Sequence, residues 1–241
     1  MDLTINEIKT EKSKIVQPQC SKYGMMEHPF RMYICGSSGS GKTNMMLNLL
    51  SKDVFYKDYF DEIFVISPTA SSLDKSYKVL DLPQNRYYQP NTGIVDRIME
   101  INREGIERKG IKNTPKVLVI LDDIISYKKF VNSNSLIKLF VMGRHYNISL
   151  IVLSQAYHRI PKSIRLNCSC FCYFRGSQKE VKVICEDLCP PGVSHKGFTE
   201  TINKVTKKRY SFLFVDLNRP QEDRYKQNFD MRIEFNSNHL H

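Results

Sequence analysis

The sequence has few of the features that mark membrane, secreted or fibrous proteins. Its longest apolar runs, such as Val117–Leu121, fall far short of the ~20 residues that a membrane-spanning helix needs. Residues 1–7 lack the basic-then-apolar order of a secretory signal, repeats are missing, and glycine (11) and proline (10) are scarce. We therefore expect an ordinary globular protein that neither spans a membrane nor is exported.

The cysteines do not form a disulfide or zinc pattern. There are seven, an odd number, and no two are spaced as C-x-x-C. Cys168, Cys170 and Cys172 alternate at period two, which predicts a strand with small apolar side chains on one face. A zinc site that adds Cys185, Cys189 and His195 is a weaker alternative, because side chains along a straight strand form a row about 13 Å long and cannot surround one ion. Free thiols in a reducing compartment are the simpler expectation.

The chain has a large excess of positive charge. Lys and Arg number 36 and Asp and Glu 25, a formal net charge of +11. Such an excess favours a polyanionic partner, because lysine and arginine gain affinity for nucleic acid through counterion release. The alternative is that these charges only keep the surface solvated.

Strands and helices alternate along the chain from Phe30 onward. Short apolar runs that end in turn residues predict strands, and longer runs without glycine or proline predict helices. The alternation predicts one α/β domain with a mostly parallel central sheet flanked by helices. The expected strands are 31–35, 62–66, 117–121, 148–153, 168–174 and 211–215, with a candidate edge strand at 231–235, and the expected helices are 43–50, 94–101, 135–142 and 178–188.

Three parts of the chain follow from this pattern. Residues 1–28 are polar without a sustained period and are assigned to an N-terminal extension. The domain itself is expected over residues 29–217, and residues 218–241 form a mostly polar C-terminal tail. Inside the domain, a long polar connection follows strand 62–66 as far as Asn91.

One motif matches G-x-x-x-x-G-K-[ST] in full and lies between a predicted strand and a predicted helix. Glycines are needed because the loop must wind backbone N–H groups around a phosphate. The lysine can reach the β- and γ-phosphates, the threonine hydroxyl can hold Mg²⁺, and the following helix aims its positive end at the same phosphates. The motif predicts a phosphate-binding loop for ATP, formed by Gly36, Ser37, Ser38, Gly39, Ser40, Gly41, Lys42 and Thr43.

Two acidic residues follow the strand 117–121. An acid at the end of a parallel strand points toward the crevice where such a sheet binds ligands. We expect Asp122 to hold Mg²⁺ together with Thr43, and Asp123 to orient or deprotonate the attacking water. An ordinary acidic turn after a buried strand is the alternative.

The strand 148–153 is followed by Ser154 and Gln155. If that strand lies between the P-loop strand and the Asp122 strand, Gln155 reaches the γ-phosphate and can position water or sense the phosphate. Just before the strand, Arg144 is a candidate arginine finger that neutralises transition-state charge from a neighbouring subunit, and Arg165 is its rival. Either arginine can instead contact DNA or form a surface ion pair.

In this order the motifs closely resemble those of the poxvirus-type DNA-packaging ATPases of large DNA viruses and virophages, within the FtsK–HerA superfamily. The resemblance covers about residues 28 to 190. The residues that carry it are His28-Pro29-Phe30-Arg31-Met32, the P-loop, Leu118–Asp123, Gly143-Arg144-His145-Tyr146-Asn147-Ile148-Ser149 and Ser154-Gln155.

This resemblance implies an additional-strand P-loop fold of the RecA and FtsK–HerA type and a homo-oligomeric ring, a pentamer or hexamer. It implies ATP- and Mg²⁺-dependent movement of double-stranded DNA into a preformed capsid, with capsid or portal-vertex proteins as partners, in the virion or the host-cell cytoplasm. The family pattern places the arginine finger on Arg144 and a polar sensor on Gln155. Cellular members usually have Asp-Glu where this chain has Asp122-Asp123, so the shorter Asp123 carboxylate reaches less far as a base.

Three other functions fit the P-loop. A nucleotide kinase needs a second substrate pocket and usually an arginine-rich lid, and no such lid is evident. A replicative helicase of similar fold is distinguished by strand separation on a forked duplex. A scaffold that binds ATP only as a switch keeps its DNA handling when Asp123 becomes Asn.

Overall fold

The structure is a computed structural model that describes residues 15–69 and 75–235. Within these ranges nine strands form one sheet in the order β3-β2-β4-β5-β1-β6-β7-β8-β9. Strands β3 to β6 in this order are parallel, and β7, β8 and β9 are each antiparallel to the strand before. The strands are β1 Arg31–Cys35, β2 Glu62–Ile66, β3 Tyr87–Tyr88, β4 Val117–Asp122, β5 Ile148–Ser154, β6 Cys170–Phe174, β7 Phe212–Asp216, β8 Tyr225–Gln227 and β9 Met231–Arg232.

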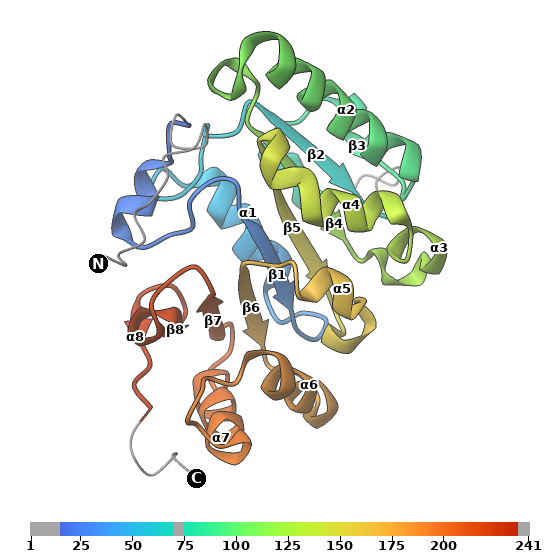
Figure 1. Cartoon of the computed structure of the whole chain (residues 1–241). Coiled ribbons are helices and arrows are strands. Elements are labelled where there is room, and N and C mark those ends of the chain that lie inside the picture. Colours follow the sequence, from blue (N-terminus) through green and yellow to red (C-terminus); the bar gives the residue numbers. More distant parts are fainter. Residues whose placement is uncertain (1–14, 70–74, 236–241) are drawn as a thin grey trace, which may run out of the picture.

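Helices cover both faces of the sheet, and the central strands are therefore mostly apolar. In β4, Val117, Val119 and Leu121 point into one core, whereas Leu118 and Ile120 point into the other. Helices α2, α4, α6 and α7 pack on the first face and α1 on the second, as Figure 1 shows with α1 behind the sheet. The helices are α1 Lys42–Ser51, α2 Thr92–Lys109, α3 Lys128–Val131, α4 Asn134–Met142, α5 Lys162–Arg165, α6 Gln178–Leu188, α7 His195–Val205 and α8 Gln221–Arg224.

This architecture confirms the predicted fold class, a mostly parallel sheet flanked by helices. It differs from the sequence prediction at the ends of the chain. In the segment assigned to a C-terminal tail, β8 pairs with β7 and β9 with β8, so the sheet continues past residue 217; β9 lies within the candidate edge strand 231–235, whereas β8 was not expected. In the segment assigned to an N-terminal extension, Cys20, Met25 and Met26 are buried in the core beside α1. The remaining parts of these two segments, 1–14 and 236–241, lie outside the described residues.

A buried histidine ties the N-terminal segment to the start of β5. His28 is 3% exposed. The hydroxyl oxygen of Ser149 accepts the Phe30 N–H at 3.0 Å, which leaves its own proton for His28 Nδ1 at 2.7 Å. Asn147 Nδ2 donates to the Thr114 carbonyl at 2.9 Å, so its Oδ1 accepts from His28 Nε2 at 2.8 Å. The ring is therefore neutral with its proton on Nε2, and burial lowers the pKa of His28 from 6.5 to about 4.

We expect this histidine to make the stability of the protein fall in mild acid. Between pH 6.5 and about 4, His28 is protonated in the unfolded chain but stays neutral in the folded chain. The free energy of unfolding then falls by about 3 kcal/mol over that window. Urea unfolding of wild type and His28→Gln at about pH 7 and about pH 5 measures this, and the variant should lack this part of the acid slope. Equal slopes in both proteins would contradict the assignment, and His195→Gln, at an exposed position, is the control.

Candidate nucleotide site

The P-loop connects β1 to α1 and is fixed by the ends of two neighbouring strands. The Gly36 N–H donates to the Ser154 carbonyl of β5 at 3.2 Å, and the Ser37 N–H donates to the Arg175 carbonyl after β6 at 3.4 Å. Glycine is required at both ends of the loop. A Cβ at Gly36 would lie 2.5 Å from the Cβ of Phe174, and Gly41 has a φ of 105°, in the left-handed region.

Lys42 curls back into the loop that precedes it. Its Nζ donates to the carbonyls of Gly36 at 2.7 Å and Ser37 at 2.9 Å. Partial burial lowers the pKa of Lys42, and the negative charges of Asp122 and Asp123 act in the opposite direction. In the structure the ammonium group is thus held by the loop carbonyls.

The sheet order brings the acidic pair and Gln155 to the same edge. Strand β5 lies between β1 and β4, and this is the strand order that Gln155 needs in order to reach the site. Gln155 Nε2 donates to Asp123 Oδ2 at 3.4 Å. The Asp123 N–H donates to the Leu153 carbonyl at 3.2 Å, and Asp123 has a φ of 50°. The candidate base thus lies on a strained turn, supported by the neighbouring strand.

The two candidate finger arginines have very different surroundings. Arg165 is 8% exposed; its Nε donates to Asp187 Oδ2 at 2.7 Å and its Nη1 to the Ile160 carbonyl at 2.7 Å. Its guanidinium also lies over the Tyr157 ring, 5.1 Å from the centroid. These contacts hold Arg165 within its own chain, whereas Arg144 is exposed.

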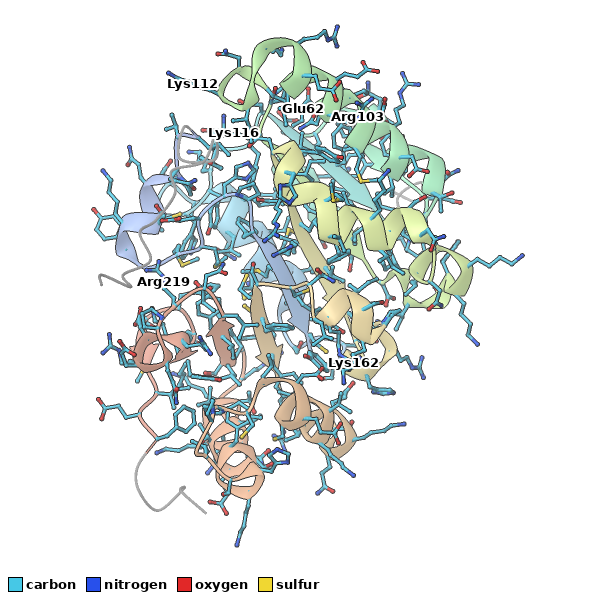
Figure 2. The ribbon with its side chains drawn as sticks, viewed as in Figure 1. Glu62, Arg103, Lys112, Lys116, Lys162 and Arg219 are labelled. Atoms are coloured by element: carbon cyan, nitrogen blue, oxygen red, sulfur yellow. The ribbon has the colours of Figure 1, made fainter. Side chains whose placement is uncertain are left out.

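Arg144 lies at the opposite edge of the sheet from the P-loop. It belongs to the short 3-10 helix η8 (Gly143–Tyr146) that precedes β5, and its charge lowers the pKa of Arg31 at the start of β1, second to the effect of burial. Figure 2 shows the two edges: Lys116 lies where the parallel strands begin, and Lys162 of α5 lies where β5 and β1 end. Strand β5 has seven residues, so about 20 Å separates its two ends.

The residues assigned to Mg²⁺ fit that ion. Thr43 and Asp122 offer a hydroxyl and a carboxylate oxygen, and Mg²⁺ typically takes one or two carboxylates together with water and substrate phosphates. Among residues 15–69 and 75–235, no three His, Cys, Asp or Glu side chains are grouped to hold a metal, so the zinc alternative has no such cluster there. All seven cysteines are free.

Sequence reasoning missed one residue at this site. Tyr77, on the 3-10 helix η4 (Lys75–Leu80), donates from its hydroxyl to Asp122 Oδ2 at 2.7 Å. It lies in the polar connection after β2, where neither periodicity nor a motif marks it. No signal in a single sequence links it to an aspartate 45 positions further along.

No helix in the described part of the chain is both long and apolar enough to cross a membrane. The sequence itself has clear relatives. The DNA packaging protein OPG160 of monkeypox virus is 28% identical over 198 residues, which cover 80% of this chain and 63% of that protein. The chain thus spans less than two thirds of that relative's length.

Solved structures show the same fold. B204, the DNA-packaging ATPase from Sulfolobus turreted icosahedral virus, matches with a TM-score of 0.56 at 14% identity, over 79% of this chain and 93% of that one. The genome packaging NTPase B204 from Sulfolobus turreted icosahedral virus 2, in complex with ATPγS, matches with a TM-score of 0.52 at 13% identity, over 80% of this chain and 94% of that one. These matches support the predicted P-loop fold. Comparison with protein families shows more than the fold. The poxvirus A32 protein family matches residues 18–216, and the chain therefore belongs to that family.

Proposed function

We propose that this chain is an ATP-hydrolysing motor that moves double-stranded viral DNA into a preformed capsid. The observation that carries the proposal is the meeting of Lys42, Asp123 and Gln155 at the ends of three adjacent strands, β1, β4 and β5. The similarity to a DNA packaging protein and to a packaging NTPase bound to ATPγS supports the substrate and the task.

Each residue of the edge has a role in this proposal. Lys42 leaves the loop carbonyls to bind the β- and γ-phosphates, and the loop N–H groups hold the same phosphates. Mg²⁺ held by Thr43 and Asp122 would offset the phosphate charge. Asp123 accepts a proton from the attacking water, and Gln155, hydrogen-bonded to Asp123, fixes the direction of that carboxylate and senses the γ-phosphate.

The position of Arg144 makes the proposed site depend on a second copy of the chain. Because Arg144 is about 20 Å from the end of its own strand that holds Gln155, it cannot reach its own nucleotide. A neighbour stacked head to tail would bring its Arg144 edge onto this P-loop edge, and repeating that contact closes a ring when the rotations between neighbours add up to a full turn. The pentamer or hexamer predicted from the family resemblance has this kind of contact.

The structure reduces the set of basic residues that are available to contact DNA. Arg165 is occupied by Asp187, so only Lys162 remains free for DNA in the segment 162–165. The run Lys207-Lys208-Arg209 lies beside the P-loop, because a Cβ at Gly41 would be 2.9 Å from Cδ1 of the next residue, Tyr210. Contacts from such lysines and arginines to phosphates do not depend on base sequence, as packaging of a whole genome requires. In this proposal, DNA packaging takes place where virions assemble, in the virion or the host-cell cytoplasm, and capsid or portal-vertex proteins are the partners.

Steady-state ATP hydrolysis with and without duplex DNA tests the proposal. We expect hydrolysis without any small-molecule acceptor, and a higher rate when duplex DNA is added. Turnover that needs a nucleotide or nucleoside acceptor would instead identify a kinase, and separation of the strands of a forked duplex would identify a helicase.

A further inference from the structure

We propose that Tyr77 is a positioning residue that fixes the Asp122 carboxylate in the orientation needed to bind the Mg²⁺ of Mg·ATP. The inference rests on the proposed function. It starts from one contact, the hydrogen bond of 2.7 Å from the Tyr77 hydroxyl to Asp122 Oδ2. Tyr77 comes from a connection between β2 and β3 that no motif singles out.

The Tyr77 side chain is held rigidly. It is 4% exposed and packs in the core on the α1 side of the sheet, together with Met45 and Leu49 of α1. The Tyr87 ring meets it edge to face with 6.4 Å between the centroids. The Tyr87 hydroxyl also donates to the Tyr77 main-chain carbonyl at 3.4 Å. Both the ring and the backbone of Tyr77 are therefore fixed before any nucleotide binds.

A fixed hydroxyl determines the direction of both carboxylate oxygens. A hydrogen bond to a charged acceptor is about twice as strong as one between neutral groups. Because the carboxylate is planar, holding Oδ2 sets its rotation about the Cβ–Cγ bond and so the direction of Oδ1. Groups that hydrogen-bond a metal ligand in this way typically change metal affinity about 10- to 100-fold when removed.

The hydroxyl also connects two parts of the nucleotide site. Tyr77 reaches Asp122 of β4 from η4, a short segment that packs against α1, the helix that follows the P-loop. The metal ligand and the phosphate loop are therefore joined by a buried contact as well as by the sheet. The Tyr77 hydroxyl is thus a polar contact between η4 and the proposed metal ligand.

The test is the Mg²⁺ dependence of nucleotide binding in the full-length chain carrying Tyr77→Phe. Binding of a non-hydrolysable ATP analogue is titrated with MgCl₂, and also measured with excess EDTA. We expect the Mg²⁺ concentration at half-saturation to rise about 10- to 100-fold, while analogue affinity in EDTA and the thermal unfolding midpoint stay as in wild type. Tyr88→Phe is the matched control. It removes a hydroxyl that donates to the Asn85 carbonyl at 2.7 Å and not to Asp122.

A double-mutant cycle separates positioning from general damage. In an Asp122→Asn background, Tyr77→Phe should cause little further change, because the tyrosine acts through that carboxylate. An unchanged Mg²⁺ half-saturation in Tyr77→Phe, or an equal change in both backgrounds, overturns the inference and leaves the proposed function standing. Failure of wild type to bind the analogue with Mg²⁺ overturns both.

Discussion

Replacing Arg144 by alanine should lower kcat for ATP hydrolysis by about 10³- to 10⁵-fold, the range by which arginine fingers accelerate phosphoryl transfer. The guanidinium of Arg144 is exposed at the edge where β1 and β5 begin, away from its own P-loop. Its loss should therefore remove charge stabilisation from the neighbour's site and leave ATP binding to its own loop intact. Rates of hydrolysis and equilibrium binding of ATP measure the two effects separately.

Mixing experiments identify which subunit supplies the arginine. In the proposed ring, a mixture of Lys42→Ala and Arg144→Ala chains has some sites with an intact Lys42 and an intact Arg144 from two different chains. We expect such mixtures to regain activity that neither variant has alone. Arg108→Ala is the matched control. Arg108 is an arginine near the same edge, and its Nη2 lies 3.6 Å from Oε2 of Glu104 on its own helix. Mixtures with no more activity than the two variants separately would contradict a finger that acts between subunits.

The second large effect is expected at Asp123. Changing it to asparagine should lower kcat by about 10²- to 10⁴-fold, the usual contribution of a general base, without weakening ATP binding. Asparagine keeps nearly the same shape and tolerates the positive φ of 50° that this position has, so the turn should not be disturbed. What is lost is the negative charge and with it the ability to accept a proton from water.

Asp58→Asn provides the control for that substitution. Asp58 is an exposed aspartate with a similar φ of 55°, so its replacement repeats the chemical and backbone change away from the nucleotide site. Asp123→Glu restores a carboxylate and should recover part of the activity. Wild-type hydrolysis by the Asp123→Asn variant would contradict the base role, whereas a variant that has lost hydrolysis and still packages DNA would support an ATP-gated scaffold.

The central strands could be predicted from the sequence because the apolar run that marks each strand lies within the strand itself. The runs 32–35, 63–66 and 117–121 are apolar at every position, which marks a strand buried on both faces, and the structure places β1, β2 and β4 there. The phosphate loop was equally predictable, because its glycines serve a backbone conformation that no other residue adopts as easily. Together these features determine the fold class.

Elements that depend on distant contacts were not predicted. Helix α7 contains Gly197, two threonines and Asn203, all weak helix formers. Its Ser194 cap, which accepts the Gly197 N–H at 3.1 Å, and the spacing of Phe198, Ile202 and Val205 were the available signals. Strand β8 has three residues, and it forms where Tyr225 packs on Phe198 and donates to the Leu188 carbonyl at 2.9 Å. A polar sequence of that length carries no strand signal by itself.

The site shows the same division. Motif and sheet order together placed Lys42, the acidic pair and Gln155 at one edge. Spacing alone could not rank the two arginines, because the partner that buries Arg165 is Asp187, on another helix. Tyr77 was missed for the same reason, since its hydrogen bond joins two segments that only the folded chain brings together.

Calorimetric titration of Mg·ATP into wild type and Lys42→Ala tests the central claim most directly, namely that the P-loop and the acidic pair form one nucleotide site. Losing a hydrogen bond to a charged group costs about 1.5–3 kcal/mol, so the affinity of Lys42→Ala should fall about 10- to 100-fold. Lys52→Ala, at the exposed end of the same helix, should bind as wild type does. Wild-type protein without measurable affinity for Mg·ATP, or equal affinity in the Lys42→Ala variant, would contradict the account.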